Sequence, residues 1–174
     1  FMSVFFHKVK SKSILISSFI LIILSVEIYA VINQAMQMIE SVGYISSGNL
    51  KGVTANRNIT AFSIAIKIPF ALYLIYLSKK NSIKILLSLI VFLSILCLTL
   101  IESRAAFLAL GLILFSYLLL NTILFLKSRK SIKKLLVNLY FILPLFFAVL
   151  INQIYYADKG VDAVSRAATI SFGT

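Results

Sequence analysis

Three arginines stand where the sequence suggests that a helix begins. Asn58 follows the first of them, and a serine precedes each of the other two in a repeated Ser-Arg-Ala-Ala string. Serine and asparagine are favoured N-caps, and the N-terminus of a helix offers free N–H groups to an anion. The planar guanidinium adds a fork of donors that fits a phosphate. We therefore predict a phosphate or pyrophosphate site made of Arg57, Arg104, Arg166, Asn58 and Ser103.

Glu27 and Lys67 are a second pair of candidate residues, because both charges fall inside long apolar stretches. Charges within a spanning helix are costly and usually face a bundle interior or water. From the helical rise we expect Glu27 to lie about 8 Å and Lys67 about 12 Å from the outer surface of the membrane. One hypothesis is an ion pair that lines an outward-facing cavity. Separate snorkelling of the two side chains, or a purely structural pair, explains them equally well.

The rest of the composition excludes several kinds of chemistry. A net charge of +12 would suggest nucleic acid in a soluble chain. Here the positive residues flank apolar blocks, so we expect no nucleic-acid partner. Cys97 is the single cysteine and His7 the single histidine. We therefore expect no metal site and no cofactor, and the sequence has no phosphate-loop or dinucleotide fingerprint.

Apolar segments of spanning length make up most of the chain, which is 61% hydrophobic with a mean hydropathy of +1.05. A helix of about 20 residues crosses a bilayer, where its backbone must satisfy its own hydrogen bonds. We predict an all-α polytopic transmembrane bundle that forms a single domain. Its spans are expected at residues 14–32, 59–77, 83–101, 105–126 and 135–154. The prediction also places an outer loop with a short interfacial helix at 33–58, and the start of a periplasmic segment at 155–174.

Lysines set the expected orientation of these spans. They cluster before the first span, between the second and third, and between the fourth and fifth, whereas the alternate connections carry few. The positive-inside rule therefore places the N-terminus in the cytoplasm and the C-terminal tail outside. The candidate arginines fall on the outer side, where orientation does not require positive charge. For any one of them, contact with lipid headgroups is the simpler explanation.

Two strings of residues resemble markers of the O-antigen ligase and O-antigen polymerase superfamily. The string GVTANRNITA at residues 52–61, followed by Pro69, is similar to the G-x-x-x-N-x-N-x-x-A…P region of that family. The string ESRAAFLAL at residues 102–110 resembles its S-R-x-x-x-L helix start after a short periplasmic turn. Ser165-Arg166 resembles the arginine that opens its large periplasmic segment.

The resemblance implies a C-type glycosyltransferase fold in the bacterial inner membrane, acting on the periplasmic face without a metal or nucleotide sugar. The donor would be a glycan on undecaprenyl pyrophosphate, and the acceptor would be lipid A-core or another lipid-linked glycan. Arginines of the family hold the pyrophosphate, a role that would fall to Arg57, Arg104 and Arg166. The catalytic histidine of the family lies beyond the position of Thr174. We therefore expect this chain to be a fragment that is inactive alone.

Two other functions fit the same residues. A transporter or flippase of a polar or anionic substrate would depend on Glu27 and Lys67 more than on the arginines. A non-enzymatic membrane module would only pack its spans against other subunits, and each arginine could then be replaced singly.

Overall fold

The structure is a computed structural model that describes residues 2–127 and 138–157. Helices make up nearly all of these residues, and no strand occurs among them. The all-α prediction is therefore confirmed. The long helices are α1 (Met2–Val42), α2 (Arg57–Leu77), α3 (Asn81–Ile101), α4 (Arg104–Lys127) and α6 (Leu139–Ala157).

Four of these helices are long and apolar enough to cross a bilayer. Their spanning segments are Ser11–Val42, Arg57–Leu77, Asn81–Ile101 and Arg104–Ile123. The fifth predicted span corresponds to α6, whose apolar stretch Leu139–Ile154 is shorter. The described residues thus form a multi-pass helical membrane protein.

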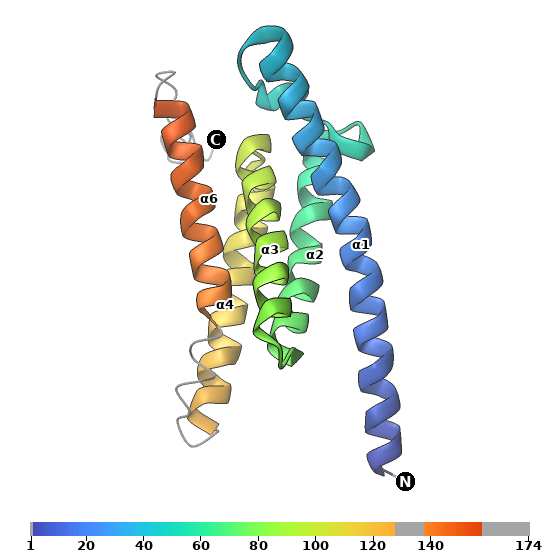
Figure 1. The fold of residues 1–174 in the computed structure, drawn as a ribbon. Helices are drawn as coiled ribbons and strands as arrows, with labels where there is room; N and C mark the ends of the chain where they lie inside the picture. The colour runs from blue at the N-terminus through green and yellow to red at the C-terminus, as the bar shows by residue number, and fades with distance from the viewer. Residues whose placement is uncertain (1, 128–137, 158–174) are drawn as a thin grey trace, which may run out of the picture.

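The bundle is organised around α2 and α3, which pack against each other at its centre. α1 and α4 pack on α2, and α6 packs on α3 (Figure 1). Small and branched residues such as Ala61, Ala65 and Val91 are fully buried in these contacts, which lets the helices approach closely. The outward faces carry large exposed side chains such as Leu15 and Phe115. Exposed apolar faces of this kind are suited to contact with lipid.

Successive helices run in opposite directions, so their connections fall alternately at two ends of the bundle (Figure 1). One end holds the start of α1, the α2–α3 turn with Lys79 and Lys80, and the first turn of α3 with Lys84, and we name it the lysine end. The other holds residues 43–56 and the Glu102–Ser103 turn between α3 and α4, and we name it the loop end. Lysines thus gather at one end, as the sequence indicates. Which end faces the cytoplasm stays a prediction.

The predicted outer loop at 33–58 is wrong in part, because its first residues are helical. α1 does not stop near residue 32 but continues to Val42, with no separate interfacial helix. Gln34, Ala35 and Met36 are good helix formers, and the helix ends only at Gly43, whose φ of 78° is left-handed. The fall in hydropathy after residue 32 therefore accompanies a continuing helix and not a loop.

Residues 43–56 form a compact connection that Gln34 and Thr60 hold from either side. The Gln34 carboxamide accepts hydrogen bonds from the backbone N–H groups of Lys51 (3.1 Å) and Gly52 (2.9 Å). It also donates to the Gly52 carbonyl (3.3 Å). From α2, the Thr60 hydroxyl donates to the Lys51 carbonyl (2.5 Å). The connection therefore ties α1 to the first turn of α2, which carries Arg57.

Gly52 is the position where this connection tolerates substitution least. Its φ is +58°, and a Cβ there would lie 2.6 Å from Thr60 Cγ2. We predict that Gly52→Ala lowers the free energy of unfolding by about 1–3 kcal/mol, through backbone strain and displacement of Thr60. Thermal or denaturant unfolding in detergent measures the change. Gly48→Ala is the matched control, because a Cβ at Gly48 meets nothing within 4 Å. Equal stability of the two variants would contradict the proposed role of the loop.

Candidate functional site

A hydrogen bond between Ser103 and Asn58 joins the starts of α2 and α4 at the loop end. The Ser103 hydroxyl donates to Asn58 Oδ1 over 3.1 Å across 45 residues of sequence, and Ser103 is 3% exposed. Each of the two helices begins with an arginine, Arg57 in α2 and Arg104 in α4. The bond therefore brings together two arginine-bearing helix starts. Because both helices begin at the loop end, the positive ends of their dipoles also point the same way.

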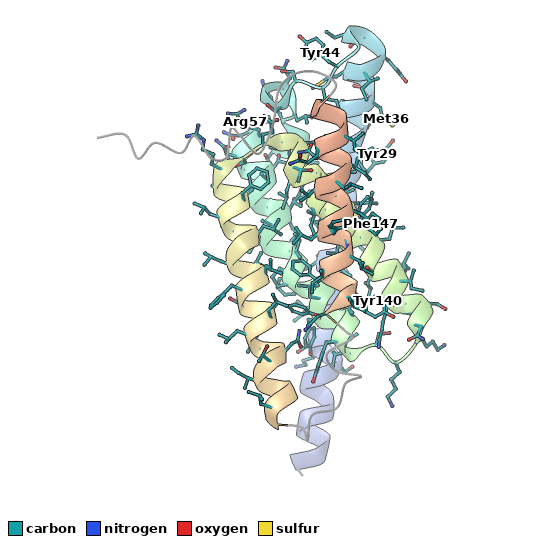
Figure 2. All side chains as sticks on the ribbon, turned by 90° about the vertical axis from the view of Figure 1, so that its left-hand side faces the viewer. Tyr29, Met36, Tyr44, Arg57, Tyr140 and Phe147 are labelled. Atoms are coloured by element: carbon teal, nitrogen blue, oxygen red, sulfur yellow. The ribbon has the colours of Figure 1, made fainter. Side chains whose placement is uncertain are left out.

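Both arginine side chains are exposed and not folded into the bundle. Figure 2 shows Arg57 at the loop end, close to where α4 begins. Lys51, in the adjoining connection, is exposed as well. No ion pair engages these three cations within the part of the chain that the structure describes. They are therefore available to an anion that approaches from the loop end, whereas Arg166 lies outside the described residues.

The cap of α2 is Asn56 and not Asn58, which corrects the reading of Asn58 as the capping residue. Asn56 is extended (φ −133°), and its side-chain oxygen accepts from the N–H groups of Asn58 (3.0 Å) and Ile59 (3.4 Å). The helix begins at Arg57, so Asn58 already belongs to its first turn. Two of the free N–H groups at this helix start are thereby taken. α2 can bind an anion mainly through the Arg57 guanidinium.

The start of α4 is more open than the start of α2. Glu102 ends α3 in a left-handed conformation (φ 53°), and α4 begins two residues later. The Ser103 hydroxyl turns to Asn58, and among the described hydrogen bonds no side chain caps the first-turn N–H groups of α4. This helix start therefore offers backbone donors together with Arg104, a combination that suits a phosphate group.

The loop-end cluster, defined here as Arg57, Arg104 and Lys51, is positively charged, and Glu102 in the α3–α4 turn is the carboxylate nearest to Arg104 along the chain. His7, the only histidine, belongs to the first turns of α1 at the lysine end. The searched residues contain no group of acidic, cysteine and histidine side chains that would hold a metal ion. The geometry therefore suits binding an anion and stabilising negative charge.

Glu27 and Lys67 form an ion pair between α1 and α2. Lys67 Nζ lies 2.8 Å from each oxygen of the Glu27 carboxylate. The Ser63 hydroxyl donates to the same carboxylate over 2.7 Å, and the ammonium also donates to the Ser63 carbonyl (3.1 Å). The Lys67 and Glu27 side chains are only 15% and 10% exposed. The three side chains thus satisfy one another at the α1–α2 interface.

This ion pair lies beside the middle of α2. α2 runs from Arg57 to Leu77, so Lys67 is its middle residue, about 15 Å from either end. α1 continues well beyond Glu27, to Val42. The predicted depths of about 8 and 12 Å from the outer surface of the membrane stay a prediction. The pair lies at the α1–α2 interface, whereas a cavity of about 470 Å³ opens between α2 and α4 and is lined by neither residue.

Two residues of these arrangements were not among the predicted site residues. Ser63 lies four residues before Lys67, a spacing that places two side chains on the same face of a helix, and this could have identified it. Asn56 stands immediately before Arg57, which is the position where an N-cap would be expected if the helix starts at the arginine.

The ion pair should show strong energetic coupling. We predict that Glu27→Gln or Lys67→Met alone lowers the free energy of unfolding by about 3 kcal/mol, because each leaves its partner charge buried without compensation. The double variant should lose much less than the sum of the two. Lys51→Met is a control, since this exposed lysine has no ion pair with any residue that the structure describes. Additive losses, measured by unfolding in detergent, would show that the two charges are not coupled.

Comparison with known proteins adds nothing to this geometry. No protein-family model matches the chain, and the searches of curated proteins and of solved structures give no match either. The resemblance of residues 52–61 and 102–110 to one family therefore stays a prediction. The function of the loop-end cluster has to be argued from its own residues.

Proposed function

We propose that the chain is part of a membrane glycan ligase or polymerase of the O-antigen type in the bacterial inner membrane. It would transfer a glycan from undecaprenyl pyrophosphate to lipid A-core or to another lipid-linked glycan. The loop end would face the periplasm and the N-terminus the cytoplasm. The observation that supports this most is the Ser103–Asn58 hydrogen bond, because it assembles Arg57 and Arg104 at one place.

Transfer of a glycan from a lipid pyrophosphate releases a leaving group that gains negative charge. Fixed positive donors near this group lower the barrier, since they stabilise charge that develops in the transition state. A guanidinium can grip two phosphate oxygens at once, which a lysine cannot. Arg57, Arg104 and the open start of α4 supply such donors. In the family that the strings resemble, a periplasmic histidine activates the acceptor hydroxyl, a role of general-base type.

The residues that resemble the family markers also hold the two arginines in place. Gly52 allows the close approach of Thr60, and Asn56 caps the helix that Arg57 begins. Asn58 then binds Ser103, the residue before Arg104. These contacts fix the two helix starts relative to each other. They support a role in which the spacing of the guanidinium groups matters, as gripping a pyrophosphate would require.

The arginines can be tested in the protein that contains this chain. We predict that Arg104→Lys reduces transfer from a fluorescent lipid-linked glycan nearly as much as Arg104→Ala, by about a hundredfold, because lysine keeps the charge but loses the bidentate grip. Arg57→Lys should act in the same direction. The exposed Lys12 of α1, at the lysine end, provides the control, and Lys12→Ala should leave the rate unchanged. Transfer at the wild-type rate by both arginine-to-lysine variants would contradict the proposed role of these arginines.

A transporter or flippase is the second candidate function, and the ion pair at the middle of α2 favours it. A charge pair at mid-membrane is typical of substrate and ion pathways. In proteoliposomes with a labelled lipid-linked glycan, this function predicts that Glu27→Gln and Lys67→Met each abolish flipping at normal expression. Arg57→Ala and Arg104→Ala should leave flipping in place. The reverse pattern would favour the ligase.

A further inference from the structure

The cavity between α2 and α4 is a feature that the proposed function does not use. Its volume of about 470 Å³ lies in the range of small-molecule sites. Several lining side chains, such as those of Tyr76 and Leu112, are themselves exposed, so the cavity opens at the side of the bundle. The lining residues that matter here are Pro69, Tyr73, Tyr76, Leu112, Ser116 and Tyr117. We name this feature the α2–α4 groove.

The groove occupies one half of the membrane-spanning region. Its α2 side begins at Pro69, just past the middle of the helix, and reaches Tyr76, next to the last residue Leu77. At the helical rise this is about 10 Å along the axis. The groove therefore extends from near the bilayer centre to the lysine end. In a bilayer, the open side of the groove would face the lipid chains of that leaflet.

The polarity of the lining changes along the groove. Pro69 and Leu112 line the part nearest the bilayer centre, whereas Tyr76 and Asn121 lie nearest the lysine end. Tyrosine favours the level of the headgroups, where its ring is in hydrocarbon and its hydroxyl can reach polar groups. An apolar inner part with the exposed Tyr76 at the shallow end matches a phospholipid, whose chain lies deep and whose esters lie shallow.

Two lysines follow the shallow end of the groove along the chain. Lys79 and Lys80 are exposed and follow Tyr76 within about one turn, after Ser78 ends α2. Lysines at this level attract anionic lipid headgroups, and basic pockets between spanning helices bind them. We propose that the α2–α4 groove binds an anionic phospholipid, with an acyl chain between the helices and its phosphate at Lys79 and Lys80. The proposal does not depend on the glycan-transfer function.

A helix of another subunit is a less suitable occupant. Helices associate in membranes through small residues that let their backbones approach, and bulky rings hinder such an approach. Tyr73, Tyr76 and Tyr117 surround the groove. A flexible acyl chain can fit between these rings, and the exposed lysines supply a charge that a lipid phosphate complements but an apolar helix does not.

Photo-crosslinking in nanodiscs tests the proposal with two lipid probes. The chain is reconstituted in a neutral-lipid bilayer that contains phosphatidylglycerol or phosphatidylcholine carrying the same diazirine on one acyl chain. After irradiation, peptide mass spectrometry locates the cross-links. We expect the phosphatidylglycerol probe to label residues 69–76 and 112–121 about tenfold more than the phosphatidylcholine probe does. Both probes should label the exposed outer face of α1 equally.

Matched variants separate the groove from the general surface. Ser116→Phe fills the groove and should remove most of the label, whereas Leu119→Phe, also exposed on α4 but outside the lining, should not. Replacing Lys79 and Lys80 by alanine should abolish the preference for phosphatidylglycerol. Replacing Lys12 and Lys84 instead should preserve it. Equal labelling by the two probes, label that survives Ser116→Phe, or chain-to-chain cross-links through the groove would each overturn the proposal.

Discussion

Hydrocarbon offers no water to a polar group, and this constraint governs the inside of the bundle. The backbone satisfies it by forming helices. Glu27, Lys67 and Ser63 satisfy it by bonding one another at the level of the middle of α2. Each buried charge is tolerated only because the opposite charge lies beside it. α1 and α2 must therefore pack so that Glu27 and Lys67 lie at the same level along the bundle. With α2 fixed against α1, the contacts of α2 with α3 and α4 set the rest of the bundle.

Other polar side chains hold the connections between the helices. At the loop end, Gln34 and Thr60 bind backbone atoms of the connection that leads to α2. The Ser103 hydroxyl donates a hydrogen bond to Asn58, which fixes the start of α4 beside the start of α2. The guanidinium groups of this end take part in none of these bonds. The polar contacts thus build a rigid frame around cations that remain exposed.

The strings that resemble the ligase and polymerase family can be separated into positioning residues and arginines. Gly52, Asn56 and Asn58 have roles in folding that require no substrate. A local turn, a helix cap and a helix–helix bond explain why these types are needed at these places. Folding gives no comparable reason for Arg57 and Arg104, which are exposed helix starts. The functional argument therefore depends on the arginines and on the frame that spaces them.

By itself the sequence determined the four long spans, the alternation of lysine-rich connections and the helix starts at the arginines. These features follow from hydropathy, length and capping, which act between residues close in the chain. Only the tertiary structure decided that α1 continues past residue 32, that Glu27 faces Lys67 beside the middle of α2, that the starts of α2 and α4 touch, and that a groove opens between these helices. Contacts between helices depend on how their side chains fit together. The periodicity along one helix does not specify which helix it packs against.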